Sequence, residues 1–142
     1  MNARGLVDTG ALLALLDKSD RWHKRCLEAF EATPLPLATS AAVLAELFHL
    51  LAPSKTELDA AWRLLHSGAV TVLGIDDSEL PRLEELMKKY HDRPMDFADA
   101  TLVHLAARES LVTVFTMDHD DFETYRIAGR RRFRIVPERK GK

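Results

Sequence analysis

Short runs of β-branched and aliphatic residues alternate along this 142-residue chain with longer segments whose apolar residues recur at helical spacing. This alternation predicts the α/β fold class, because a chain that returns across a sheet through a helix forms a parallel strand. We therefore expect a central, mostly parallel β-sheet flanked by α-helices. The expected strands are residues 5–8, 37–38, 70–73 and 112–116, with 133–136 as an edge strand.

Helices are expected in the segments between these strands. They are predicted at residues 10–17, 20–32, 41–51, 56–67 and 97–109, and in a segment that ends near Tyr90. Thr39 or Ser40 suits the N-cap of the third helix, and Asp77 or Ser78 that of the helix before Tyr90. The chain has the length of one domain and shows no linker or repeat, so we expect a single domain over residues 1–142.

The composition, 46% hydrophobic and 30% charged, is typical of soluble globular proteins. The single cysteine, Cys26, has no partner in the chain for a disulfide, which fits a reducing compartment. The early apolar run at residues 11–16 is too short for a signal-peptide core or a membrane span. These features predict a cytoplasmic protein without membrane association.

Charge is divided unevenly along the chain. Residues 1–125 hold 12 Lys and Arg against 21 Asp and Glu, a net charge of −9, whereas residues 126–142 hold 8 against 1, a net charge of +7. A block of like charge at a chain end can serve as an arm for nucleic acid, although a solvated tail without a function is also common. Both interpretations of the basic tail from about Arg126 stay open.

Acidic residues follow two of the predicted strands. Asp8 ends the first strand, and Asp118 comes two residues after the strand at 112–116. Ligands of open parallel sheets bind beyond the carboxyl ends of the strands, so both residues are candidates for a functional site. The alternative is that they are turn and cap residues of the segments that follow. If Asp118 is a ligand, Asp121 caps or supports the turn after it.

Two predicted helices carry further candidate carboxylates. Glu46 lies in a helix that is apolar nearly all the way round, which predicts a buried carboxylate that needs a cation or hydrogen bonds; the alternative is an ion pair at the helix rim. Asp96 and Asp99 open the helix at 97–109, where the helix dipole favours negative charge. Asp96 suits the N-cap, and Asp99 lies where it can reach a neighbouring strand end.

Four carboxylates at converging positions favour a site for a hard divalent cation, Mg²⁺ or Mn²⁺, because such ions prefer oxygen ligands. A bound ion of this kind activates water and stabilises charge at phosphorus, as in phosphodiester hydrolysis. The six histidines are dispersed, and no Ser-His-Asp or Cys-His set stands out. His119, next to Asp118, is a weaker candidate for substrate contact.

Four segments, residues 6–17, 39–46, 95–100 and 116–122, together resemble the PIN-domain family in matching order, as does the spacing of Asp20 and His23. The resemblance implies a central parallel sheet, a Mg²⁺ or Mn²⁺ site and cleavage of single-stranded RNA. The residues that match the acidic motif of the family are Asp8, Glu46, Asp99 and Asp118, with Thr116 in a supporting position and Asp96 as an additional candidate ligand.

Many PIN domains of this size are VapC-like toxins that form homodimers and are inhibited by a small antitoxin. The resemblance therefore implies an endoribonuclease that is the toxin of a type II toxin-antitoxin pair. The alternatives are an RNA-processing nuclease without an antitoxin and a non-catalytic module that binds RNA or protein; the presence of all four acids argues against the latter. A haloacid-dehalogenase-type phosphatase needs a second Asp at the position of Gly10 and is disfavoured.

Overall fold

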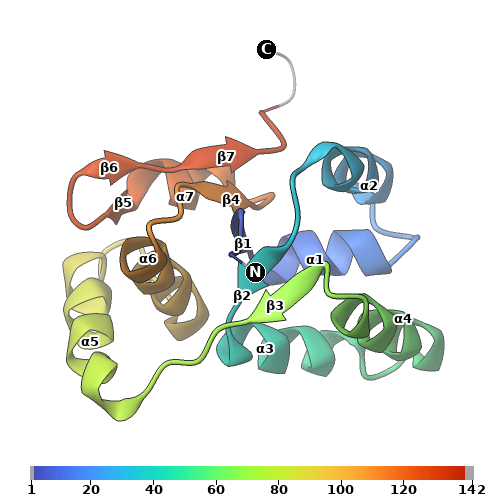
Figure 1. The fold of residues 1–142 in the computed structure, drawn as a ribbon, viewed down its shortest axis with the longest axis horizontal. Coiled ribbons are helices and arrows are strands. Elements are labelled where there is room, and N and C mark those ends of the chain that lie inside the picture. Colours follow the sequence, from blue (N-terminus) through green and yellow to red (C-terminus); the bar gives the residue numbers. More distant parts are fainter. Residues whose placement is uncertain (1, 140–142) are drawn as a thin grey trace.

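The computed structural model describes residues 2–139, and within them five parallel strands form one sheet (Figure 1). The strand order is β3-β2-β1-β4-β7. The bounds are β1 (Gly5–Val7), β2 (Leu37–Thr39), β3 (Val70–Val72), β4 (Thr113–Phe115) and β7 (Arg134–Val136). The predicted α/β class is confirmed, and the segment expected at an edge of the sheet lies there as β7.

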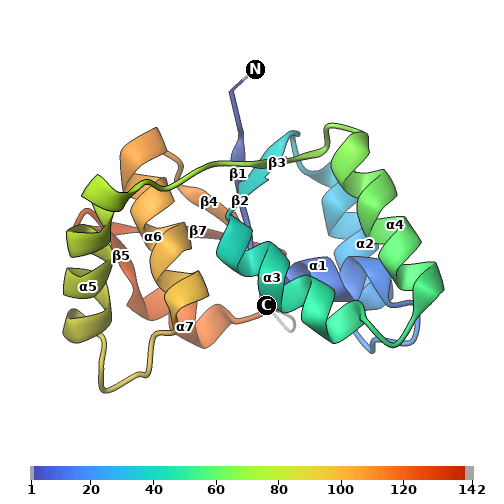
Figure 2. The same ribbon diagram turned by 90° about the horizontal axis from the view of Figure 1, so that it is seen from below.

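Helices flank the sheet in two groups. In Figure 2, α1 (Thr9–Leu16), α2 (His23–Ala32), α3 (Ala41–Leu51) and α4 (Lys55–His66) lie on one side, and α5 (Leu80–Lys89) and α6 (Phe97–Glu109) on the other. Helix α3 contacts both α1 and α6, so the two groups meet there. This meeting point brings residues from distant parts of the chain to one edge of the sheet.

The helix starts follow local capping chemistry. Ser40 caps α3 by accepting a hydrogen bond from the backbone N–H of Val43 at 3.3 Å, as expected. The cap before α5 is Asp76 rather than Asp77 or Ser78, because it forms a capping box with Glu79 and opens a 3-10 turn, η1 (Asp77–Glu79). Helix α2 begins later than predicted, since Asp20 instead accepts from the N–H of Trp22 at 2.8 Å in a turn.

The core is built around the central strands. Leu6 and Val7 on β1 and Phe115 on β4 are fully buried. Gly5 allows these two strands to approach, because a Cβ at this position would lie 2.9 Å from the carbonyl oxygen of Thr113. A side chain at position 5 would therefore push β1 and β4 apart, and both strands end at the same edge of the sheet.

The basic segment expected as a tail is folded as far as the structure describes it. After α7 (His119–Thr124), β5 (Arg126–Ile127) pairs antiparallel with β6 (Arg131–Arg132), and the chain continues into β7. Lys140 and Lys142 lie outside the described residues. Within residues 2–139, no helix is both long and apolar enough to cross a membrane.

Candidate active site

The six carboxylates that the sequence offers as candidate ligands or supporting groups line one cleft of about 540 Å³ at the carboxyl ends of β1 and β4. The lining residues are Asp8, Thr9, Gly10, Glu46, Leu50, Pro94, Asp96, Asp99, Met117, Asp118 and Asp121. No lysine or arginine is among them. The wall of the cleft therefore concentrates negative charge.

Asp8 both caps a helix and lines the cleft, so its capping contact leaves it at the candidate site. One carboxylate oxygen accepts a hydrogen bond from the N–H of Ala11 at 2.9 Å, which caps α1, and the other accepts from the Thr116 hydroxyl. Burial raises the pKa of Asp8 to about 6, and the nearby charges of Asp118 and Glu46 add to the rise while the two hydrogen bonds oppose it.

Asp118 is joined to Asp8 through Thr116. The backbone N–H of Asp118 donates to the Thr116 hydroxyl oxygen at 2.9 Å, while that hydroxyl donates to Asp8. The Asp118 carboxylate also caps α7 by accepting from the N–H of Asp121 at 3.2 Å. Removal from water raises the pKa of Asp118 to about 6, and the carboxylate of Asp121 adds to the rise. The structure thus supports a bridging position for Thr116.

Glu46 is exposed at the cleft, and the prediction that it is buried was wrong. The core-facing residues of α3 are Val43, Leu47 and Leu51, whereas the apolar pattern also continues onto the exposed side of the helix. Leu50, one turn after Glu46, is 47% exposed and lines the cleft. Glu46 is held by the hydroxyl of Thr9, which donates to its carboxylate at 2.8 Å.

Asp96 and Asp99 lie at the start of α6, as expected. Asp96 caps the helix by accepting from the N–H of Asp99 at 2.8 Å, which confirms its predicted N-cap role, and it also lines the cleft. The Asp99 carboxylate accepts a hydrogen bond from the Tyr125 hydroxyl at 3.0 Å. Burial raises the pKa of Asp99 to about 7, with the charge of Asp96 as the second cause.

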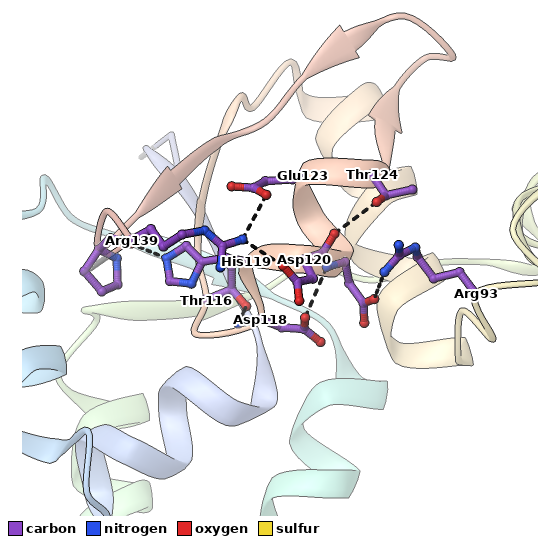
Figure 3. A network of polar contacts seen from close by, with 10 residues as sticks. Arg93, Thr116, Asp118, His119, Asp120, Glu123, Thr124 and Arg139 are labelled. Carbon is purple, nitrogen blue, oxygen red and sulfur yellow. Dashed lines mark hydrogen bonds and ion pairs between the residues drawn. The ribbon is translucent and has the colours of Figure 1, made fainter. Parts of the chain in front are cut away.

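Helix α7 is braced from several directions by charged and polar contacts (Figure 3). Arg93 reaches Asp121 with a nitrogen-to-oxygen distance of 2.9 Å, and Arg139 bridges Asp120 and Glu123 at 2.8 and 2.9 Å. His119 lies 2.7 Å from the Pro137 carbonyl oxygen and is absent from the cleft wall. Its observed contact therefore braces α7 and gives no support to the predicted role in substrate contact.

Asp20 and His23 are likewise absent from the cleft wall. The Nδ1 atom of His23 lies 2.8 Å from the Ala14 carbonyl oxygen, so it connects α2 to α1.

Sequence reasoning also missed three residues that contact the acids: Thr9, Arg93 and Tyr125. Thr9 follows Asp8 directly and could have been noticed, whereas nothing in the chain signals that Tyr125 meets an acid 26 residues away.

The donor set fits a hard divalent cation, because carboxylate oxygens are the ligands that Mg²⁺ and Mn²⁺ prefer. Among residues 2–139, no three His, Cys, Asp or Glu side chains are gathered closely enough to hold one ion. The acids are instead spread around the wall of the cleft. Waters can complete the coordination of a Mg²⁺ ion, which commonly takes one or two carboxylates from the protein.

The parallel sheet carries acids beyond β1 and β4, and helices α3 and α6 add further acids to the same cleft. This is an α/β protein with an acidic site at the carboxyl edge of its sheet. The PIN domain family model matches residues 5–128 of the chain. Ribonuclease VapC26 of Mycobacterium tuberculosis is 32% identical over 135 residues, which cover 93% of this chain and 99% of that protein. This chain belongs to the PIN-domain family.

Solved structures show the same fold. VapC20 of Mycobacterium tuberculosis, described as a toxin that cleaves the sarcin-ricin loop, superposes with a TM-score of 0.72 at 23% identity over 81% of this chain and 90% of that one. A toxin-antitoxin complex from Klebsiella pneumoniae has a chain that superposes with a TM-score of 0.65 at 21% identity, covering 84% and 91% of the two chains. At these identities the likeness concerns the fold alone.

Proposed function

We propose that this protein is a metal-dependent endoribonuclease that cleaves single-stranded RNA. The observation that carries the proposal is a cleft lined by six carboxylates and no cationic side chain, in which three of the acids have raised pKa values. Carboxylates that line one cleft repel one another and a phosphate, and a divalent cation relieves both repulsions. The name of the relative, ribonuclease VapC26, supports nuclease activity.

The residues that would hold Mg²⁺ or Mn²⁺ are Asp8, Glu46, Asp99 and Asp118, with Asp96 as a further candidate. Such an ion, when bound, supplies a more acidic water and stabilises the charge that develops at phosphorus. Asp8 and Asp118 follow strand ends and are joined by Thr116, so their backbones are fixed relative to each other. Leu50 and Met117 add an apolar part to the wall, suited to packing against a base or ribose.

The thiol of Cys26 offers no alternative nucleophile. It is buried in the core, and burial raises its pKa to about 11, so the reactive thiolate is scarce at neutral pH. Hydrolysis by activated water is the chemistry that the cleft supports.

The direct test uses a pool of structured and unstructured RNAs with Mn²⁺ and then with EDTA. Asp8→Asn should fold but not cleave. Asp120→Asn is the matched control, because Asp120 is on α7 but pairs with Arg139 and does not line the cleft. Activity that survives both EDTA and Asp8→Asn would refute the metal mechanism.

We further propose that the protein acts in the cytoplasm as the homodimeric toxin of a type II pair, with a small antitoxin as partner. Support for the toxin and antitoxin comes from the likeness to VapC20, a toxin, and to a chain of a toxin-antitoxin complex. Wild-type protein should arrest growth of a bacterial host, Asp8→Asn should not, and co-expression of a short adjacent reading frame should relieve the arrest. A protein that cleaves RNA but does not arrest growth would instead favour the alternative, an RNA-processing enzyme without an antitoxin.

A further inference from the structure

Three of the four proposed ligands share one kind of contact. Asp8 accepts a hydrogen bond from Thr116, Glu46 accepts from Thr9, and Asp99 accepts from Tyr125. Each donor is a neutral hydroxyl, and none of these three carboxylates forms an ion pair with another described residue. A hydroxyl fixes the position of a carboxylate oxygen without cancelling its charge, which leaves the charge available for a cation.

The geometry points to Tyr125 as a positioning residue that orients the Asp99 carboxylate toward the cation, with Thr9 in the same role toward Glu46. This inference rests on the proposed metal-dependent nuclease. It assigns to Tyr125 no contact with substrate, only an action through Asp99.

The surroundings of Tyr125 hold its hydroxyl in place. The side chain is fully buried, and its ring packs edge-to-face against Tyr90 and Phe122 at centroid distances of 5.0 and 5.2 Å. The hydroxyl donates to Oδ2 of Asp99, whose Oδ1 accepts no hydrogen bond from the described residues. One oxygen of Asp99 is therefore anchored and the other is left for a ligand.

Helix α7 connects Tyr125 to a second acid. Asp118 is the N-cap of this helix and Tyr125 its C-cap. The helix has six residues, roughly 9 Å at 1.5 Å per residue, so Asp118 lines the cleft at one end while Tyr125 contacts Asp99 from the other. Tyr125 thus ties the position of Asp99 on α6 to that of Asp118 beyond β4.

The test compares Tyr125→Phe with Tyr90→Phe. Each substitution removes one hydroxyl and keeps the ring, but the Tyr90 hydroxyl accepts from the N–H of Arg126 at 3.0 Å and touches no acid of the cleft. Mn²⁺ binding without RNA, measured by calorimetry, should weaken about tenfold or more in Tyr125→Phe and stay unchanged in Tyr90→Phe. Cleavage by Tyr125→Phe should fall at low Mn²⁺ and recover at saturating Mn²⁺.

A double-variant cycle separates positioning from a general structural role. In an Asp99→Asn background, Tyr125→Phe should cause no further loss of Mn²⁺ affinity. If Tyr125→Phe does not fold, Thr9→Val tests the same use of a hydroxyl at Glu46. Wild-type affinity in the folded hydroxyl variant would overturn the inference, whereas a wild-type protein that neither binds Mn²⁺ nor cleaves RNA would overturn the proposed function itself.

Discussion

At the start of α6, two carboxylates three residues apart have different local roles. Asp96 accepts from the N–H of Asp99, so Asp96→Ala should lower the free energy of unfolding by about 0.5 to 2 kcal/mol. Asp99→Asn should abolish cleavage with little loss of stability, because an amide oxygen can still accept from Tyr125. Denaturant unfolding in EDTA and RNA cleavage in Mn²⁺ measure the two effects. The reverse pattern would mean that the roles are interchanged.

Between elements, Glu79 ties η1 to α6. Its carboxylate accepts a hydrogen bond from the backbone N–H of Asp76 at 2.9 Å. One carboxylate oxygen also lies 2.6 Å from Nε2 of His104 and 2.7 Å from a guanidinium nitrogen of Arg108. These contacts lower the pKa of Glu79 from 4.5 to about 2. Because the folded pKa is the lower one, the stabilisation is present above pH 4.5 and is lost as the pH falls toward 2. Glu79→Gln should therefore be less stable than wild type at pH 7, and the difference should shrink through that window in melting curves. A difference independent of pH would contradict this.

The contact between β1 and β4 depends on Gly5. In Gly5→Ala the new methyl group would meet the Thr113 carbonyl oxygen at 2.9 Å, so the strands that carry the cleft must shift. Overpacking of this kind costs about 1–3 kcal/mol of unfolding free energy. Gly74→Ala is the control, because nothing lies within 4 Å of a Cβ there. Equal denaturation midpoints for the two variants would show that the sheet adapts without cost.

At the scale of the whole molecule, four arginines near the C-terminus form a basic surface, Arg130, Arg131, Arg132 and Arg134. All four are exposed and form no ion pair with other described residues. Arg130 and Arg131 line a hollow beside Ala106, near the end of α6, whereas Asp99 is near its start. Along the axis of α6, Ala106 lies roughly 10 Å from Asp99 at 1.5 Å per residue.

If this surface binds RNA phosphates, removing three arginines should flatten the slope of log affinity against log salt by about two, since each phosphate contact on a single strand contributes about 0.7. The measurement uses Arg130, Arg131 and Arg132 changed to Gln in the inactive Asp8→Asn protein. The control changes Lys18, Arg21 and Lys24, which are also exposed, to Gln and removes the same charge. An unchanged slope in the arginine variant would leave the basic surface without a role in RNA capture.

Properties that depend on near neighbours in the chain were readable from the sequence. The alternation of strands and helices, the cap at Asp96 and the strand-end placement of Asp8 are of this kind, because hydrogen bonds within a few residues and burial of an apolar run decide them. The family motif added the expectation that four separated acids share a site, and all four line one cleft.

Tertiary packing decided the rest. Whether Glu46 is buried depends on which face of an apolar helix meets the sheet, and α3 turns Val43 and Leu47 inward, which leaves Glu46 at the cleft. The pairing of β5 with β6 gives the basic segment a folded form that its charge does not reveal. The contact of Tyr125 with Asp99 joins the C-cap of α7 to the first turn of α6. Such contacts join residues far apart in the chain. The spacing of apolar residues indicates which side of a segment is buried, but it does not indicate which segments pack together.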